Sequence, residues 1–221
     1  MVSFIFRGNG EIPSLGDGPS QSIYQGALDL RVNGEVRWIG IQGGSYRTLD
    51  MSLPPNLVLP DAYLDFKTDG VMTALVMVQL LLEPYPVNPF LVYAAFFEND
   101  SCLDFLTRPY QDYLPDHLLA MIHDKQTRDL VAAVLKMTPQ DVISLREPIN
   151  NLLVERAMSI EIPGYLFQRV RHAGEHEGIV RPLLSLLLLG HHAPWTRRQF
   201  EGFRKGIRLG LCQVDDMLKV T

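Results

Sequence analysis

The longest apolar stretch of the chain, residues 70–97, reads GVMTALVMVQLLLEPYPVNPFLVYAAFF. In its first half, Val71–Leu82, Gln79 is the one large polar side chain. A helix without a polar face is buried on all sides, so this segment predicts a central core helix. Its length would be about 18 Å at 1.5 Å per residue, and a membrane-spanning helix needs roughly 20 residues. We therefore expect a buried helix of a globular protein rather than a membrane span.

The residues around this helix predict where it begins and ends. Thr68 and Asp69 have side chains that can cap its first turn. Pro84 and Pro86 cannot continue the helix, so they turn the chain toward a second apolar run, Phe90–Phe97. Two successive buried helices predict a large helical core.

Before this core, short apolar runs alternate with glycine and proline. Val2–Phe6 alternates and is rich in Phe, Ile and Val, which predicts a short strand. Arg7–Ser20 contains four glycines and two prolines, which predicts a loop. Its glycine spacing is neither that of a P-loop nor that of a dinucleotide-binding loop, so we do not expect it to bind phosphate.

A short helix and a second strand are expected to follow this loop. Ser20 or Ser22 can cap a helix that continues to Leu30. The second strand is expected at Val36–Ile41, where Asn33-Gly34 introduces it and Gly43-Gly44 closes it.

The next segment, residues 51–60, contains three prolines and predicts an irregular connector. We expect Leu53, Leu57, Val58 and Leu59 to hold this connector against the core, so it should not separate two domains.

From Asp69 onward the pattern is helical throughout. The expected helices after the core pair are Pro115–His123, Thr127–Met137, Thr138–Leu145, Asn151–Met158, Pro163–His172, Ile179–Leu189, Thr196–Leu209 and Val214–Val220. The predicted fold class is therefore mainly α (α+β), with a helical core and a small N-terminal β portion. We expect a single domain over residues 1–221, with the strands and glycine loop in residues 1–50 and the helical portion in residues 51–221.

Composition and charge narrow the classes of function. The chain has 221 residues, of which 47% are hydrophobic and 20% are charged, and its formal net charge is -5. A weakly acidic chain without a polybasic run gives no electrostatic reason to expect nucleic-acid binding. Cys102 and Cys212 are too few for a secreted disulfide framework, which favours two free thiols in an intracellular protein of the cytoplasm or nucleus.

Histidines suggest a metal site only weakly. His172 and His176 have the i, i+4 spacing that shares one helix face, but Gly174 and Gly178 interrupt the segment. His191-His192 precedes a proline and is typical of a helix end, where partial positive charge is favourable. We predict no metal ligands and no cofactor.

The usual catalytic patterns are missing from the sequence. It contains no Gly-x-Ser-x-Gly motif, and Cys102 has no base close to it in sequence, so a small buried hydrophobic residue is the commoner interpretation. Asp215 and Asp216 resemble a carboxylate pair, but acidic residues at a surface helix start are far more common. We assign no catalytic residue.

A basic cluster follows the last histidines. Its members are Arg197, Arg198, Arg204, Lys205 and Arg208. Such a cluster is most often a solvated helix face, and the more specific alternative is a docking surface for an acidic partner. Arg197, Arg198 and Arg204 are the candidate partner contacts.

Three separated stretches resemble the N-terminal lobe of the HECT ubiquitin ligases. The first, FRGNGEIPSLGDGPSQSIYQGAL, is similar to the opening segment of that lobe, although Gln21 to Tyr24 stand where the family usually has an Arg-Glu-aromatic run. The second is the apolar stretch at residues 70–97. The third and most specific is Gln199–Gly206 followed by LCQVDDMLKV, which resembles the closing signature of the lobe.

This resemblance implies a role in ubiquitin conjugation without catalysis. In the family, the N-terminal lobe binds the ubiquitin-conjugating (E2) enzyme, and a separate C-terminal lobe carries the cysteine that accepts ubiquitin. The sequence ends where that second lobe would begin, and Cys212 lacks the family's Thr-Cys-x-Asn setting. The segment between Asp104 and His172 is also shorter than the E2-binding subdomain of the family.

Two hypotheses about function follow. The first is a HECT-like N-lobe that serves as a scaffold or contacts an E2 enzyme, without the lobe that forms the thioester. The alternative is a non-catalytic helical adaptor domain that uses Thr196–Arg208 as its docking helix. Both predict an E2 enzyme or another protein as the partner, and neither predicts a nucleic acid or a membrane.

Overall fold

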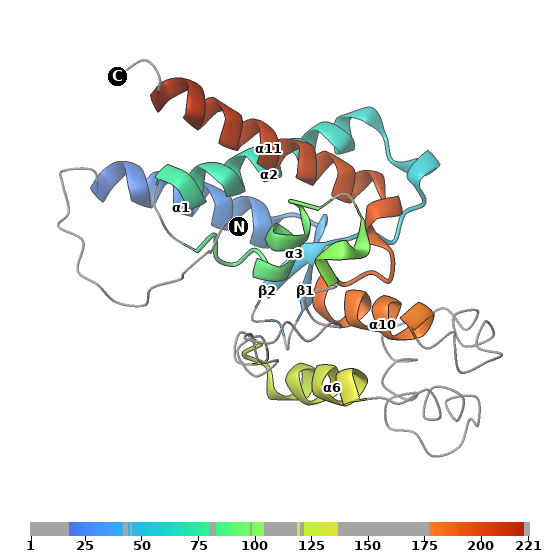
Figure 1. Ribbon diagram of the computed structural model, residues 1–221. Coiled ribbons are helices and arrows are strands. Elements are labelled where there is room, and N and C mark those ends of the chain that lie inside the picture. The colour runs from blue at the N-terminus through green and yellow to red at the C-terminus, as the bar shows by residue number, and fades with distance from the viewer. Residues whose placement is uncertain are drawn as a thin grey trace.

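The computed structural model describes residues 18–41, 44, 46–79, 83–97, 99–103, 119, 122–136 and 177–218 (Figure 1). In this part of the chain the protein is mainly helical and has one small antiparallel sheet, which confirms the predicted fold class. The α-helices are α1 (Gly18–Gly34), α2 (Pro60–Gln79), α3 (Pro89–Ala94), α6 (Lys125–Lys136), α10 (Glu177–Leu189) and α11 (Arg198–Leu218). The strands are β1 (Trp38–Ile41) and β2 (Tyr46–Leu49), and the 3-10 turns are η1 (Pro55–Leu57), η2 (Asp100–Leu103) and η4 (Pro194–Thr196).

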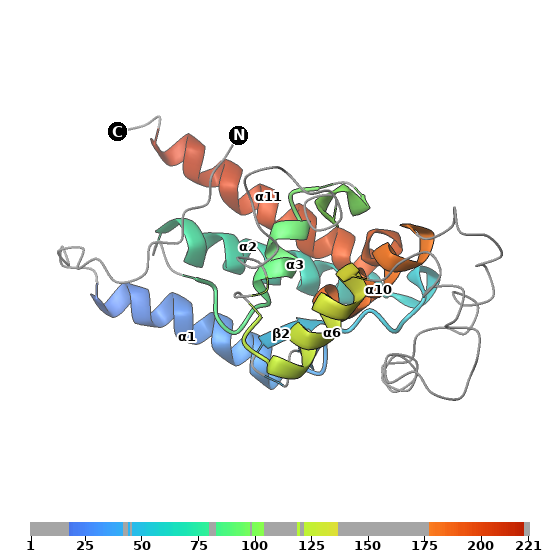
Figure 2. The same ribbon diagram turned by 60° about the horizontal axis from the view of Figure 1, so that its bottom comes forward.

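Helices α2 and α11 lie side by side and run in the same direction, with α11 along one edge of the molecule (Figures 1 and 2). Gly202, Gly206 and Gly210 are spaced four residues apart, so they lie on one face of α11. A Cβ atom at Gly206 would overlap the carbonyl oxygen of Lys67 in α2, and one at Gly210 would lie 2.7 Å from the Cβ of Ala74. The three glycines therefore let the two helix backbones touch.

Helix α2 begins at Pro60, well before the predicted start near Asp69. Proline is favoured in the first turn because its missing N–H has no partner there in any helix. Thr68 lies inside the helix, where its hydroxyl donates to the carbonyl of Leu64 at 2.9 Å. The prediction that Thr68 and Asp69 cap the helix is wrong, because the amphipathic turns before them are helical as well.

Burial along α2 is also less complete than predicted. Thr73, Ala74 and Val76 are buried, whereas Val71 and Met72 are partly exposed. The apolar composition therefore marked a helix correctly but overstated how much of it is covered.

The sheet is a hairpin in which Trp38 pairs with Leu49 and Ile41 pairs with Tyr46. Strand β1 begins two residues later than the predicted Val36, because Asn33-Gly34 ends α1 instead of starting a strand. Strand β2 was not predicted, since its four residues are too short for a clear alternation. Gly44 between the strands has φ 85°, a conformation that glycine adopts without strain.

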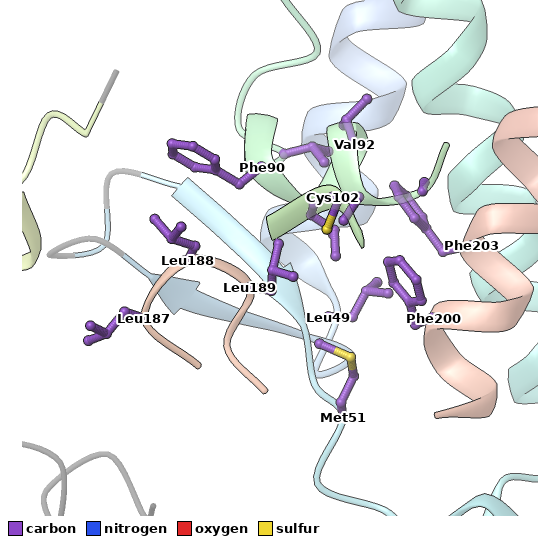
Figure 3. Close-up of a cluster of buried hydrophobic side chains, with 14 of the residues drawn as sticks. Leu49, Met51, Phe90, Val92, Cys102, Leu187, Leu188, Leu189, Phe200 and Phe203 are labelled. Carbon is purple, nitrogen blue, oxygen red and sulfur yellow. The ribbon is translucent and has the colours of Figure 1, made fainter. Parts of the chain in front are cut away.

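The core lies where the start of α11 meets α3, η2, β2 and the end of α10. Phe200 and Phe203 point from α11 toward Leu49 and Cys102 (Figure 3). The Trp38 ring packs edge-on against Phe203, with ring centroids 5.9 Å apart. Segments distant in the sequence thus share one buried cluster.

Asn88 connects the elements of this core. Its Oδ1 accepts from the backbone N–H of Phe90 at 3.1 Å, which caps the start of α3. Its Nδ2 donates to the carbonyl of Leu188 near the end of α10. Thr48 of β2 donates to the neighbouring carbonyl of Leu189 at 2.7 Å. Two side chains from other elements therefore satisfy the last carbonyls of α10.

The later helices agree only in part with the sequence prediction. Helices α6 and α10 each begin two residues before the predicted starts, Thr127 and Ile179. Residues 122–124 are not helical, so the predicted helix Pro115–His123 does not extend to its predicted end. The predicted C-terminal helices Thr196–Leu209 and Val214–Val220 are joined in one continuous helix, which begins at Arg198, two residues after the predicted start, and extends to Leu218.

Several predicted elements lie outside the described residues. They are the strand Val2–Phe6, the glycine loop before residue 18, and the helices Thr138–Leu145, Asn151–Met158 and Pro163–His172.

Candidate functional site

The three arginines predicted to contact a partner do not share one surface. The Nε of Arg197, just before α11, lies 2.9 Å from Nε2 of His191. Arg204 is partly buried and donates from Nη1 to the carbonyl of Phe97 at 3.1 Å. Arg198 is exposed. Of the three, Arg198 is therefore the one most available to a partner, while Arg197 and Arg204 also make contacts inside the molecule.

Arg198 and Lys205 lie over the ring of Tyr63 in α2. The Arg198 guanidinium carbon is 5.4 Å from the ring centroid, and the Lys205 Nζ is 5.8 Å from it. Both distances are within the range of a cation–π interaction. Lys205 also forms an ion pair of 2.7 Å with Glu201, one turn earlier. The hydrogen bond to Glu201, and then the one to Tyr63, raise the pKa of Lys205, which stays charged at neutral pH.

Exposed leucines lie in sequence just before Tyr63 and beside it. We call Leu53, Leu57, Leu59 and Leu64 the leucine surface; all four side chains are between 52% and 70% exposed. Four residues of the connector were predicted to pack on the core. The prediction is wrong for Leu53, Leu57 and Leu59, which are exposed, and only the fourth, Val58, is buried. Prolines prevent a regular repeat in this segment, so its apolar residues cannot all face inward.

The leucine surface is linked to the start of α11 and to Tyr63. Gln199 donates from Nε2 to the carbonyl of Leu53 at 3.1 Å. The backbone N–H of Tyr63 donates to the carbonyl of Leu59 at 3.0 Å. The backbone of the leucine surface is therefore tied to the two helices that carry Tyr63, Arg198 and Lys205. Sequence reasoning missed Tyr63, because no local pattern pairs it with residues 135 or more positions away.

The charge around α11 contrasts with that of the whole chain. Residues 195–211 contain five basic residues and one acidic residue, whereas the full chain has a net charge of -5. Glu201 pairs with Lys205, and the exposed cations of this stretch are Arg198, Lys205 and Arg208.

A second charged cluster is structural. Asp69 is fully buried and accepts from Arg31 Nε at 2.6 Å and from Trp38 Nε1 at 3.1 Å. Arg37 donates to Asp65 at 2.8 Å. Burial lowers the pKa of Arg31, but the carboxylates of Asp69 and Asp65 outweigh it and raise that pKa overall. Arg37 also lies 3.8 Å from Glu35. Both arginines are thus paired within the cluster, which fastens α1 and β1 to α2.

A third polar cluster surrounds Tyr46. Its hydroxyl donates to Glu83 Oε1 at 3.1 Å and lies 3.4 Å from His123 Nδ1. Burial, and then the charge of Glu83, raise the pKa of Tyr46 to about 12. The hydroxyl therefore keeps its proton near neutral pH and serves as a hydrogen-bond donor rather than as a nucleophile.

The histidines after α10 are not charged as the sequence suggested. His191 and His192 follow Gly190 at the helix end, and their rings stack with centroids 4.4 Å apart. Burial lowers the pKa of His191 to about 3, assisted by His192 and Arg197, and burial also lowers the pKa of His192. The expectation of positive charge at this helix end is wrong, because the rings are covered by the chain.

The remaining candidates add no site. In the part of the chain that the structure describes, no three His, Cys, Asp or Glu side chains lie together to bind a metal. His172, His176 and the side chains of Asp215 and Asp216 are outside the described residues. Neither cysteine forms a disulfide; Cys102 is buried, as predicted, and Cys212 is exposed. Among the described helices, none combines the length and apolar character of a membrane span.

Known proteins give no further guide, since no family model, curated protein or solved structure matches this chain. The resemblance to the HECT N-terminal lobe therefore rests on the sequence motifs alone.

Proposed function

We propose that this protein is a non-catalytic protein-binding domain that docks its partner through the first half of α11. The observation that supports this function best is the arrangement of Arg198 and Lys205 over Tyr63. Both cations are exposed, and an aromatic ring restricts where they lie. Such pre-positioning lowers the entropy lost when a charged side chain engages a partner.

The resemblance to the HECT N-terminal lobe suggests an E2 enzyme as the first partner to test. In this form of the proposal, α2 and α11 are the rigid scaffold, and the basic side chains receive an acidic region of the partner. The closing motif also supports a scaffold role, because Gln199 and Phe203 are buried and Gly206 touches α2.

Site-specific photo-crosslinking tests this proposal in the full chain. A benzophenone amino acid in place of Thr196, an exposed residue just before α11, should crosslink a discrete protein in a cell extract, whereas the same probe at Lys125, an exposed residue of α6, should not. Mass spectrometry identifies the captured protein, and that protein is then purified. Arg198→Glu with Lys205→Glu should weaken its binding about tenfold or more, equivalent to about 1.4 kcal/mol, while Lys125→Glu should leave it unchanged. Equal crosslinking at positions 196 and 125 would contradict the proposal.

Incubation with E1, E2 and ubiquitin tests the non-catalytic part of the proposal. We expect no ubiquitin adduct that reducing agent removes, although Cys212 is exposed. An adduct that disappears in Cys212→Ser would show that the chain itself carries transfer chemistry.

A further inference from the structure

Strand β1 has a free edge, because β2 pairs with only one side of it. In β2, the N–H of Arg47 donates to the carbonyl of Pro86 at 2.7 Å, and its carbonyl accepts from the N–H of Asn88 at 2.8 Å. Both backbone groups of Arg47 therefore point away from β1, so Arg47 and its partner Gly40 form a non-hydrogen-bonded pair. In such a pair the N–H and C=O of Gly40 also point outward, on the side of β1 opposite β2.

The described elements leave this edge open. Gly40 is exposed, and Ile39 beside it is 40% exposed. Among the described residues, none bonds to the N–H or the C=O of Gly40. Trp38 differs, because its N–H already donates to the carbonyl of Glu35 at 3.2 Å. Gly40 is therefore the residue of β1 whose two outward backbone groups are both available to a further strand.

The usual protection of a sheet edge is missing here. Exposed edge strands commonly carry a charge, a proline or a bulge, each of which hinders pairing with another molecule. Residues 38–44 read WIGIQGG and contain neither a charged residue nor a proline. The pairing of β1 with β2 is regular from Trp38 to Ile41, so the strand has no bulge. An edge without these features is suited to pairing with another strand.

A second copy of β1 fits this edge, because the strand is complementary to itself. In an antiparallel pair with Gly40 on the two-fold axis, the two glycines exchange both of their N–H···O bonds. The same register sets Ile39 of each copy opposite Ile41 of the other, at the close spacing of a non-hydrogen-bonded pair. An apolar side chain then covers the exposed part of Ile39, and no charge in either strand opposes the contact.

We propose that β1 is a self-association edge, through which two copies of this chain form a four-stranded antiparallel sheet centred on Gly40. This inference goes beyond the docking of a partner on α11 and does not depend on it. The interface is small, because each copy contributes one strand of four residues. Small interfaces are typical of weak complexes, so we expect a dissociation constant on the order of 10–100 µM.

Disulfide trapping in the full chain tests the register. The parent protein is Cys212→Ser, which lacks the exposed thiol. One preparation also carries Ile39→Cys and a second carries Ile41→Cys, and a mixture of the two should form a disulfide-linked dimer under mild oxidation. Each preparation alone should crosslink at least tenfold less, because identical positions are diagonal neighbours, roughly 7–8 Å apart, which is too far for a disulfide. Thr68→Cys, at an exposed position of α2, is the control that should stay monomeric in either mixture.

Sedimentation equilibrium measures the dimer itself, at protein concentrations up to about 300 µM. Ile39→Lys should weaken the dimer at least tenfold, because it places a charge against apolar side chains in both halves of the contact. Leu30→Lys is the matched control, since Leu30 is 75% exposed but lies on α1, and it should leave the dissociation constant unchanged.

Gly40→Pro provides a second variant, since proline removes the outward N–H but no bond between β1 and β2. It should abolish the dimer, and unchanged Trp38 fluorescence would show that the hairpin is still folded. Three results would overturn the inference: a monomer at every concentration, a dimer that Ile39→Lys leaves intact, or equal crosslinking in the mixture and in the separate preparations. A monomer that pairs this edge with an added strand-forming peptide would assign the edge to a partner protein and would equally overturn self-association.

Discussion

At the scale of single residues, His191 shows how burial changes what a histidine does. Its Nδ1 lies 2.9 Å from the backbone N–H of Ala193, and its Nε2 lies 2.9 Å from Nε of Arg197. Both neighbours are donors, and a neutral imidazole has one acceptor nitrogen, so at most one of these contacts can be a hydrogen bond at a time. Protonation would leave no acceptor and would place a second positive charge beside Arg197.

The pKa of His191 therefore predicts how stability depends on pH. In the folded protein this pKa is about 3, below the ordinary value of 6.5, so below pH 6.5 the unfolded chain binds a proton that the folded chain does not. This contribution to stability is complete above pH 6.5 and is lost as the pH falls toward 3, by up to about 1.4 kcal/mol per pH unit.

Urea unfolding at pH 7 and pH 5.5 measures this effect. Between pH 7 and pH 5.5, the free energy of unfolding should fall less in His191→Gln than in the unmodified protein. The fall that remains in the variant includes the contribution of His192, whose pKa is also lowered by burial. His123→Gln is the control, because His123 is exposed. Equal losses in the His191 variant and the unmodified protein would rule out this role.

At the scale of elements, α2 and α11 can pack backbone to backbone because the residues of α11 at their contact are glycines, which have no side chain. The HECT-like closing motif includes Gln199, Phe203 and Gly206, and each has a packing role here: a hydrogen bond to the connector, a position in the core, and backbone contact with α2. A motif of this composition is therefore explained by helix packing without any catalytic requirement.

Gly206→Ala tests this packing. The added methyl group would overlap the carbonyl oxygen of Lys67, so the helices must separate, and we expect a loss of about 1–3 kcal/mol in the free energy of unfolding. Gly26→Ala is the matched control, since a Cβ there meets nothing within 4 Å and α1 should gain about 0.5–1 kcal/mol. Chemical denaturation of both variants provides the comparison. A neutral Gly206→Ala would mean that the two backbones are not in contact.

At the scale of the whole molecule, a single domain over residues 1–221 is expected to unfold in one cooperative transition. Trp38 and Trp195 pack against Phe203 and Phe200, so their fluorescence reports on the start of α11. The buried thiol of Cys102 lies in η2, which contacts α10. If residues 1–221 form one domain, both signals must change together.

Unfolding of a Cys212→Ser variant tests this claim, since that substitution removes the exposed thiol. Tryptophan fluorescence and the reactivity of Cys102 toward a thiol reagent should follow the same urea transition. Earlier exposure of Cys102 would indicate that the protein contains two units of different stability.

The sequence by itself determined the features that depend on local periodicity. Apolar runs located the helix that ends at Gln79, the short α3 and the buried α10, and the mainly helical class followed from them. These predictions succeeded because hydrophobic spacing and proline act within a few residues of one another. The amphipathic character of α11 could be read in the same way, although its full length could not.

The tertiary structure alone decided which distant residues meet. It buried Asp69 among Arg31 and Trp38, and it set Arg198 and Lys205 over Tyr63, at separations that no local pattern encodes. It also left the leucines of the connector exposed. The composition of a segment shows how apolar it is, but the packing of the other elements decides whether it is covered. Here α2 and α11 meet through glycines, and the leucine surface stays exposed.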